Sequence, residues 1–552
     1  SHVVEDLKLN FIADKNLVML NSINANYKNF KITNGSIDIE NKGKIFIKGK
    51  LDSELTFNEK NIFNFIKDSF FEENKLNGKG SLVHDFNFNL DSSYKLISYN
   101  YAITGNIEDS QINLKKDLKN QFLEKSIKNI LFSNTRIEAK INNQNKNTLY
   151  LEGLYSTKNN NFKKFKVDGL LNKNAQKYKV DFDLYESILI EPLNFKSNKE
   201  INANIKSEFR LNGKNINFKS IVFSDKNNLI TINGLLLNPL YEIKNLSNMS
   251  VVTYKDKKEN NNFKINIKDK IIIGGKQFDS TNLQKLLNSK NNKNVLKNFT
   301  KEIEINLQNI ITKSRIPINN FRLIGNIEKG KFSKISAKSE FSKEKFLDIS
   351  LKKDSSNRKI LEIYSDIPKA ILTDYKFFEG IKEGKLFYNS LIDEDISVSK
   401  LTIENFNLTK APAFATLLTL ADLGGVADVL KGEGISFDIL EISLKENKDI
   451  TTINEVLALG SSISLIMEGY TEKKTGLVSL SGTLVPAKTL NSFVSKIPVV
   501  GNILVGEKIG DGVFGFSFKI KGLPGSVKTT VNPVKTLTPR FITRALERMK
   551  KN

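Results

Sequence analysis

The chain has 552 residues, 39% of them hydrophobic, and a formal net charge of +23. This apolar share suffices for one large core or several smaller ones and is too high for a chain disordered throughout. The absence of cysteine excludes disulfides, thiolate catalysis and sulfur-ligated metals. The only histidines, His2 and His84, form no cluster for zinc and suggest no Ser-His-Asp arrangement. We therefore expect neither a metal nor a cofactor.

The positive charge is carried mostly by lysines mixed with asparagine and isoleucine, as in residues 159–166 and 290–297. Such a mixture is typical of an A/T-biased genome and places charge on solvated loops. Arginine is scarce, and no basic helix with interleaved aromatic residues precedes the C-terminus, so we expect no nucleic-acid partner. The lysines would still favour an anionic membrane surface.

Period-2 alternation of apolar and polar residues dominates the first 400 residues. Such runs form strands with one apolar and one polar face. The clearest runs span 37–39, 45–47, 86–90, 178–184, 201–205, 216–218, 263–267, 303–307, 321–323 and 335–337. Turn-forming clusters at 41–43, 212–213 and 328–330 suit hairpins. We predict a long antiparallel meander over residues 1–395.

Three stretches, 59–71, 118–132 and 280–287, space their apolar residues by three and four and predict short helical segments across the sheet. Glycine recurs towards the ends of several runs, at positions 49, 153, 169, 234, 469 and 482. Two interpretations remain open for these glycines. They mark bulges or close backbone approaches, or they merely end strands.

The last 150 residues change character. Residues 411–425 begin near a proline, end in glycine and are apolar on nearly every side, which predicts a helix. Strands are expected at 434–444, 450–459, 462–470, 476–485, 512–522 and 527–531. Within 481–504, a strand leads into an apolar helical hairpin that must bury its surface against protein or lipid. A basic amphipathic helix is expected from 538 onward.

One-faced strands raise the question of what covers the apolar face. A second sheet would make a sandwich, closure would make a barrel, and lipid acyl chains would line an open curved sheet. An outer-membrane barrel is disfavoured because tryptophan is absent and the chain ends in a basic, helix-like segment. Alternation alone leaves the sandwich and the lipid groove open.

Many turn and cap positions stand at characteristic spacing near the C-terminus. They are Gly482-Thr-Leu-Val-Pro486, Leu490-Asn491-Ser, Ile497-Pro498, Gly501, Gly506, Gly510 to Gly512, Phe514, Lys521-Gly522 to Pro524, Val531-Asn532-Pro533 and Pro539. Together they resemble the C-terminal region of AsmA-like proteins of the YhdP type. The resemblance covers about residues 360 to 545, with 363–366 and 380–386 as its weaker leading edge. The upstream meander fits the family only in character.

The resemblance implies a periplasmic protein of Gram-negative bacteria, anchored in the inner membrane by an N-terminal helix that is absent from these residues. It implies a long, twisted, gutter-shaped β-sheet with an apolar interior and a few short helices at the C-terminal end. The implied function is transfer of phospholipid between the inner and outer membranes, with phospholipid and both membrane surfaces as partners. It also implies three regions: the groove at 1–395, the family region at 396–536 and the basic helix at 537–552.

Two sets of residues follow as candidates for this function. The lipid-groove candidates are Val180, Phe182, Leu184, Ile265, Ile267, Ile303, Ile305 and Leu307. The candidates for capping the groove or touching a membrane are Phe414, Leu417, Leu418, Phe493, Val494, Ile497, Val499, Phe541, Ile542 and Leu546.

A non-catalytic β-sandwich for binding, adhesion or envelope assembly is the alternative. Such a protein would bury the same alternating residues between two sheets and bind no lipid. A glycan-active enzyme would need paired carboxylates in a cleft, and the sequence places no partner beside Asp366 or Asp374. We expect no enzymatic activity.

Overall fold

The structure is a computed structural model. It describes residues 4–27, 30–57, 75–118, 126–144, 146–157, 161–172, 175–184, 187–198, 202–213, 215–283, 300–373, 378, 380–409, 412–421, 423, 433–486 and 515–534. Contacts divide the chain into two compact units, one ending at Lys268 and one beginning at Asp269.

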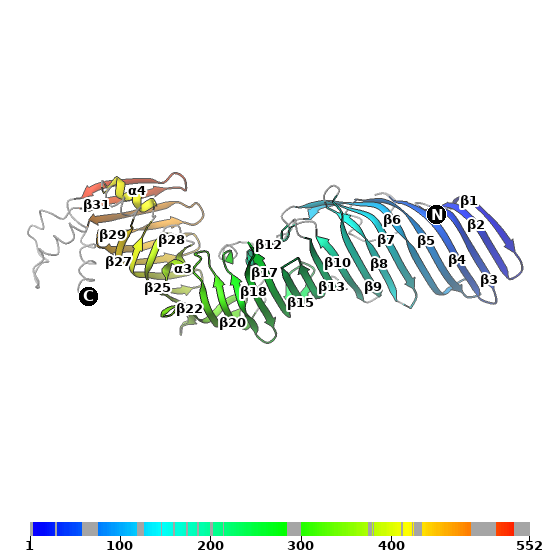
Figure 1. The fold of residues 1–552 in the computed structure, drawn as a ribbon, viewed down its shortest axis with the longest axis horizontal. Coiled ribbons are helices and arrows are strands. Elements are labelled where there is room, and N and C mark those ends of the chain that lie inside the picture. The colour runs from blue at the N-terminus through cyan, green and yellow to red at the C-terminus, as the bar shows by residue number, and fades with distance from the viewer. Residues whose placement is uncertain are drawn as a thin grey trace, which may run out of the picture. The chain divides into compact units, whose positions relative to one another are not determined.

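The first unit is one antiparallel sheet in which strands adjacent along the chain pair side by side, except that β16 and β17 both pair with β15 (Figure 1). Its strands are β1 (Glu5–Ala13), β2 (Leu17–Tyr27), β3 (Phe30–Asn41), β4 (Ile45–Phe57), β5 (Lys75–Leu90), β6 (Leu96–Leu118), β7 (Ile127–Asn142), β8 (Asn147–Ser156), β9 (Lys163–Asn172), β10 (Ala175–Leu184), β13 (Ala203–Asn212), β14 (Asn215–Ser224), β15 (Leu229–Leu237), β16 (Ile243–Asn245), β17 (Asn248–Lys255) and β18 (Lys258–Ile267). A separate ribbon between β10 and β13 contains β11 (Leu189–Ile190), the 3-10 helix η2 (Glu191–Leu193) and β12 (Phe195–Lys196).

The second unit is built in the same way, and its described residues add two short helices. Its elements are β19 (Ile271–Asp279), β20 (Lys301–Ile311), β21 (Ile318–Glu328), β22 (Lys331–Ser342), β23 (Lys345–Lys353), β24 (Lys359–Ser365), α3 (Pro368–Leu372), β25 (Ile381–Asp393), β26 (Ile396–Leu408), α4 (Pro412–Leu420), β27 (Ile435–Glu446), β28 (Ile450–Gly460), β29 (Ile463–Glu472), β30 (Val478–Pro486), β31 (Gly515–Gly522) and β32 (Lys528–Val534).

The predicted fold class is confirmed: the chain is mainly β, an antiparallel sheet curved as an open groove, with short helices in the C-terminal part. Nine of the ten clear alternating runs lie wholly in strands, residues 203–205 of the tenth lie in β13, and the turns between them use the expected chemistry. At the β21–β22 hairpin, for example, Lys329 and Gly330 both have positive φ, as a two-residue hairpin loop requires. One pair differs from the predicted meander, because β19 and β20 run parallel.

The helix expected over 118–132 is wrong for residues 127–132, which belong to β7. There, Ile130 and Phe132 pair with Ile112 and Ser110 of β6, and this cross-strand pairing overrides the helical spacing of the apolar residues. Residues 59–71 lie outside the described residues, as does the part of 280–287 beyond 283.

The boundary between compact units differs from the expected division at 395/396. That position falls in the turn between β25 and β26, which pair along their whole length. Residues 537–552, expected as a basic helix, lie outside the described residues.

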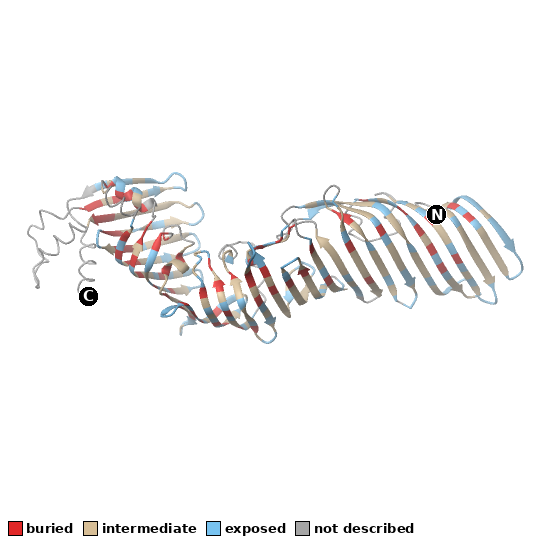
Figure 2. Cartoon of the chain, in the orientation of Figure 1, coloured by how far each residue is buried: buried red, intermediate tan, exposed pale blue. Residues whose placement is uncertain are grey.

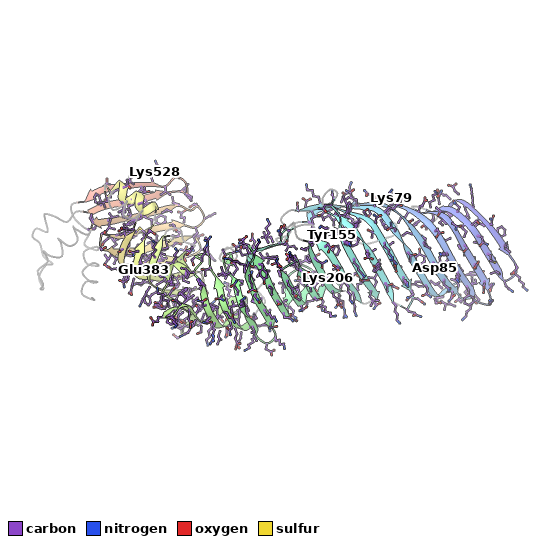
Figure 3. All side chains as sticks on the ribbon, in the orientation of Figure 1. Lys79, Asp85, Tyr155, Lys206, Glu383 and Lys528 are labelled. Carbon is purple, nitrogen blue, oxygen red and sulfur yellow. The ribbon has the colours of Figure 1, made fainter. Side chains whose placement is uncertain are left out.

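The largest hydrophobic core lies in the second unit, where α3 and α4 pack on one face of β25 to β31. Elsewhere, buried positions alternate with exposed ones along the strands, and side chains project from both sides of the layer (Figures 2 and 3). Two different environments therefore occur on the same apolar face: a packed core beside the helices and a more open surface along the meander.

Candidate functional site

The candidate site is the apolar face of the sheet, and strand register makes it continuous in the first unit. One row of directly paired residues crosses from β2 to β18 without leaving this face. It consists of Ala25, Ile32, Ser53, Leu82, Gly105, Ile137, Leu151, Val167, Val180, Ser207, Ile221, Ile232, Met249 and Ile265. Val180 and Ile265, two predicted groove residues, are thus members of the same row.

A second row runs beside it from β8 to β18. It consists of Gly153, Phe165, Phe182, Ile205, Phe223, Ile230, Val251 and Phe263. The rings of Phe165 and Phe182 stack with centroids 5.8 Å apart, and Tyr155 meets both edge-on. Leu184 and Ile267 have the same parity on β10 and β18 as Phe182 and Ile265, so they extend this face.

The second unit repeats the arrangement. One row connects Ile273, Ile305, Leu323, Ala337, Ile349, Ile363, Tyr388, Leu401, Ile442, Val456, Met467, Gly482, Phe518 and Val531. Ile303 and Leu307 stand two residues either side of Ile305 on β20 and face the same way. All eight predicted groove residues therefore lie on an apolar face, five in the first unit and three in the second.

The opposite face of the strands is polar and carries exposed ion pairs. In the first unit Lys31 pairs with Glu54 at 3.3 Å, Lys206 with Asp181 at 3.1 Å and Lys219 with Glu208 at 3.0 Å. Exposed pairs of this kind contribute little stability, about 0–1 kcal/mol each. These ion pairs instead determine which side of the sheet faces water, and they leave the other side for apolar contact.

The apolar face is only partly covered. Val180, Phe182, Leu184, Ile265, Ile267 and Ile305 are half-buried, whereas Ile303 and Leu307 are 5% and 4% exposed. The described strands supply no second sheet to lie over it, since only the β11–β12 ribbon stands apart from the strand ladder. A sandwich core would bury these residues more uniformly.

A strap formed by residues 187–198 covers one part of the first unit. Leu193 and Phe195 are buried, and the ring of Phe195 packs edge-on against Phe223 at 5.7 Å. Two buried amides hold the strap, because Nδ2 of Asn260 and Asn261 donate to the Leu193 carbonyl at 3.3 and 2.7 Å. The strap therefore ties β18 to the chain between β10 and β13.

Helix α4 covers the apolar face in the second unit. Phe414 and Leu417 are each 5% exposed and Leu418 is fully buried, in the cluster that also contains Phe437 and Leu440. These three cap candidates thus pack on the sheet. The other cap candidates, Phe493, Val494, Ile497, Val499, Phe541, Ile542 and Leu546, lie outside the described residues.

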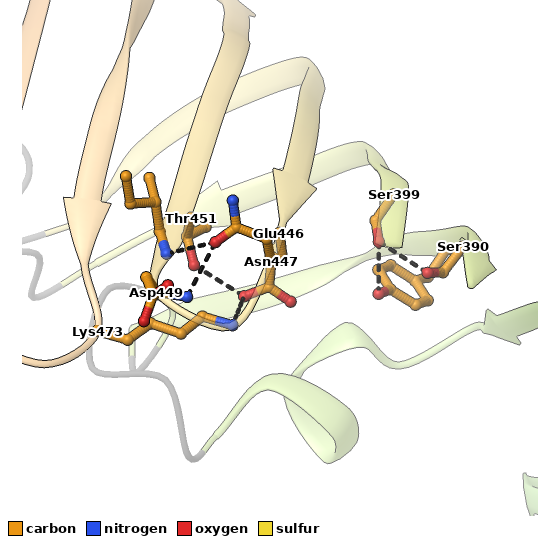
Figure 4. Close-up of polar contacts among 9 residues, drawn as sticks. Ser390, Ser399, Glu446, Asn447, Asp449, Thr451 and Lys473 are labelled. Carbon is orange, nitrogen blue, oxygen red and sulfur yellow. Dashed lines mark hydrogen bonds and ion pairs between the residues drawn. The ribbon is translucent and has the colours of Figure 1, made fainter. Parts of the chain in front are cut away.

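Two hydrogen-bonded clusters are among the polar side chains that interrupt the apolar face. In the second unit the Tyr388 hydroxyl donates to Ser399 Oγ at 3.1 Å, and Ser399 donates to Ser390 Oγ at 2.8 Å (Figure 4). In the first unit His84 lies between Ser53 and Tyr101, 2.7 Å from each hydroxyl. Sequence reasoning missed both clusters, although the parity of His84 with Leu82 and Phe86 was a signal for the second.

The charged cluster in Figure 4 belongs to the turns at the ends of β27 to β30. Lys473 pairs with Glu446 at 3.3 Å, and Thr451 donates to the same carboxylate at 2.8 Å. Asn447 Oδ1 accepts from the backbone N–H groups of Asp449 and Ile450. Every one of these contacts closes or joins turns, so the cluster explains local structure and supplies no reacting group.

Asp366 is also occupied structurally. Its carboxylate accepts hydrogen bonds from the Phe346 backbone N–H at 2.8 Å and from the Tyr364 hydroxyl. Asp374, the other carboxylate considered for catalysis, lies outside the described residues. Within the part of the chain that the structure describes, no three acidic, histidine or cysteine side chains gather as a metal site would require.

Comparison with known proteins adds no relative. No protein-family model matches the sequence, and no curated protein is significantly similar to it. Across the described residues, none of the helices has both the length and the apolar character needed to cross a bilayer.

Proposed function

We propose that this chain is a periplasmic lipid-transfer protein that carries phospholipid between the inner and outer membranes along its apolar face. The observation that carries the proposal is the continuous cross-strand row of mostly apolar residues in each unit, over which the described strands place no second sheet. The membranes and the compartment come from the resemblance to AsmA-like proteins. They rest on the sequence motifs named above.

The physical basis of binding is removal of acyl chains from water. Each buried methylene gains about 0.8 kcal/mol, so a chain of ordinary length gains substantial free energy on such a surface. Successive strands offer similar Ile, Val, Leu and Phe side chains to each row, so a lipid can move from one strand to the next without having to escape from a deep energy minimum. The head group would remain in water, and no covalent step is needed.

Site-specific photocrosslinking in cells tests the proposal with neighbouring positions as controls. A photoreactive residue at Val180 or Ile305, on the apolar face, should crosslink to phospholipid. The same residue at Lys179 or Asn306, which are exposed on the polar face of the same strands, should not. Equal crosslinking at both positions of a pair, or none at either, would contradict the proposal.

Charge substitutions separate transport from folding. Ile305→Glu should abolish co-purification of phospholipid, measured by mass spectrometry, while Asn306→Glu retains it. Urea unfolding of both variants shows whether each is folded. If the wild-type protein carries no lipid and Ile305→Glu unfolds it, Ile305 belongs to a closed β core. That result would support the alternative, a binding or scaffold protein.

A further inference from the structure

A polar chain crosses the apolar face of the first unit where that face is otherwise hydrocarbon. Ser53 on β4, His84 on β5 and Tyr101 on β6 connect three adjacent strands through the two nitrogens of the imidazole. His84 is 8% exposed and Ser53 is 3% exposed. Their direct cross-strand neighbours are apolar, since His84 pairs with Leu51 and Ile103.

The hydrogen bonds assign the protons on the ring. Ser53 Oγ is also within 3.4 Å of the Leu82 carbonyl, to which it can only donate. If Ser53 donates there, it accepts from His84 Nε2–H, and Nδ1 is left to accept the proton of the Tyr101 hydroxyl. Every donor in the chain then has an acceptor. This arrangement requires a neutral imidazole.

The groups facing the ring favour the same state. Ser53 and Leu51 face it from β4, Tyr101 stacks on it from β6 with centroids 6.0 Å apart, and Phe30 on β3 meets it edge-on at 5.7 Å. Of these only Tyr101 titrates, and burial raises the pKa of its hydroxyl. Burial lowers the pKa of His84, with the carboxylate of Asp52, on the other face of β4, opposing that effect.

We propose that His84 is a pH-sensitive switch in the lipid path: neutral, it completes an apolar surface that binds acyl chains, and protonated, it makes that surface reject them. The inference rests on the proposed function. Protonation puts a positive charge among hydrocarbon side chains. It also turns Nδ1 into a donor, so the hydrogen bond to Tyr101 must reverse and the Tyr101 hydroxyl proton loses its acceptor.

The first measurement follows the imidazole itself by NMR. His2 is the only other histidine, so a protein carrying His2→Gln gives a single histidine signal. We expect its titration midpoint below that of a free histidine side chain. Tyr101→Phe removes the hydroxyl that donates to Nδ1 of the neutral ring and should shift the midpoint upward. Asp52→Asn removes the opposing carboxylate and should shift it downward. A free-histidine midpoint that neither variant moves would overturn the switch.

The second measurement is binding of a soluble phosphatidylcholine with a fluorescent acyl chain, whose head group keeps its charge as the pH falls from 8 to about 5. If only the neutral form binds, affinity weakens by up to about tenfold for each pH unit below the His84 midpoint. Affinity should be independent of pH in His84→Gln, and in Asp52→Asn the loss should begin at lower pH.

The outcomes of the binding measurement distinguish failure of the pH switch from failure of the proposed lipid transfer. Lipid binding with the same affinity at every pH, or an equal loss in wild type and His84→Gln, would overturn the switch and leave lipid transfer standing. No lipid binding at any pH would overturn lipid transfer and the switch with it.

Discussion

The ring of Phe86 lies against the backbone of Gly49, its direct partner on the neighbouring strand, so closely that a Cβ at Gly49 would sit 2.4 Å from Phe86 Cζ. Phe518 lies over Gly482 in the second unit in the same way, with 2.5 Å to Cζ. These glycines stand within strands and not at their ends. They admit an aromatic ring from the next strand, which supports the close-approach interpretation.

Replacing Gly49 by alanine is therefore expected to destabilise the first unit by about 1–3 kcal/mol, because the added methyl forces the Phe86 ring out of its site. Urea unfolding measures the change. Gly274→Ala, on β19 of the second unit, is the control for an added methyl group that meets no obstacle, since the nearest atom to its Cβ would lie 3.7 Å away. Truncating the ring as well, in Gly49→Ala with Phe86→Leu, should recover part of the loss. Equal stability of the Gly49 and Gly274 variants would contradict the packing described.

Leu418→Ala should cost the second unit about 2–5 kcal/mol, because the side chain is fully buried between α4 and the sheet. Leu420, two residues further along the same helix, is 51% exposed. Leu420→Ala should change stability by less than about 0.5 kcal/mol. Thermal unfolding of the pair compares them directly. Similar losses in both variants would show that α4 does not pack as described.

Asn261→Ala should loosen the strap at 187–198. The Asn261 amide is fully buried and donates to the Leu193 carbonyl at 2.7 Å and to Thr253 Oγ1 at 2.9 Å. Removing it leaves buried acceptors short of a donor, at a cost of about 1–3 kcal/mol. Hydrogen exchange at 187–198 should quicken. The neighbouring Asn262→Ala, which loses only a bond to Glu259, should leave exchange in the strap unchanged.

Alkaline pH should weaken the second unit through Tyr364. Donation of its hydroxyl to Asp366 raises the pKa of Tyr364 from the ordinary 10.0 to about 12. The folded state therefore holds this proton more tightly than the unfolded state. The stability that the Tyr364–Asp366 hydrogen bond contributes is fully present below pH 10 and is lost as the pH rises towards 12.

The expected result is that Tyr364→Phe removes this part of the alkaline decline, as measured by urea unfolding across that pH range. In Asp366→Asn, ultraviolet titration should show one tyrosine ionising at lower pH than in wild type. An unchanged titration curve would mean that the Asp366 carboxylate does not hold the phenol proton.

Much of the fold was predictable from the sequence because each strand of a one-layer sheet with one apolar face must alternate apolar and polar residues. The runs at 178–184 and 303–307 needed only their period to predict both the strand and the apolar face. Residues 127–132 were not predictable in this way, because apolar residues spaced by three and four fit a helix until the partner strand β6 is known. The parallel β19–β20 pair is likewise a consequence of long-range pairing, which local sequence does not encode.

For the candidate site, too, the features set by local sequence were predictable and those set by long-range contacts were not. Membership of the apolar face followed from parity, so all eight groove candidates lie on that face. What covers that face was not predictable, because the strap is fixed by Asn260 and Asn261, far along the chain from Leu193. The Ser53–His84–Tyr101 chain also required three strands in register before its residues met.

Because strands that follow one another along the chain mostly pair with each other, the length of the sheet in each unit increases with the number of its strands. Strands in a sheet lie about 4.8 Å apart, so inserting or deleting one hairpin changes the reach of a unit by about 10 Å. Because each strand is stabilised mainly by the two beside it, such a change leaves distant strands intact. Evolution can therefore adjust the length of such a sheet one hairpin at a time, without redesigning a core.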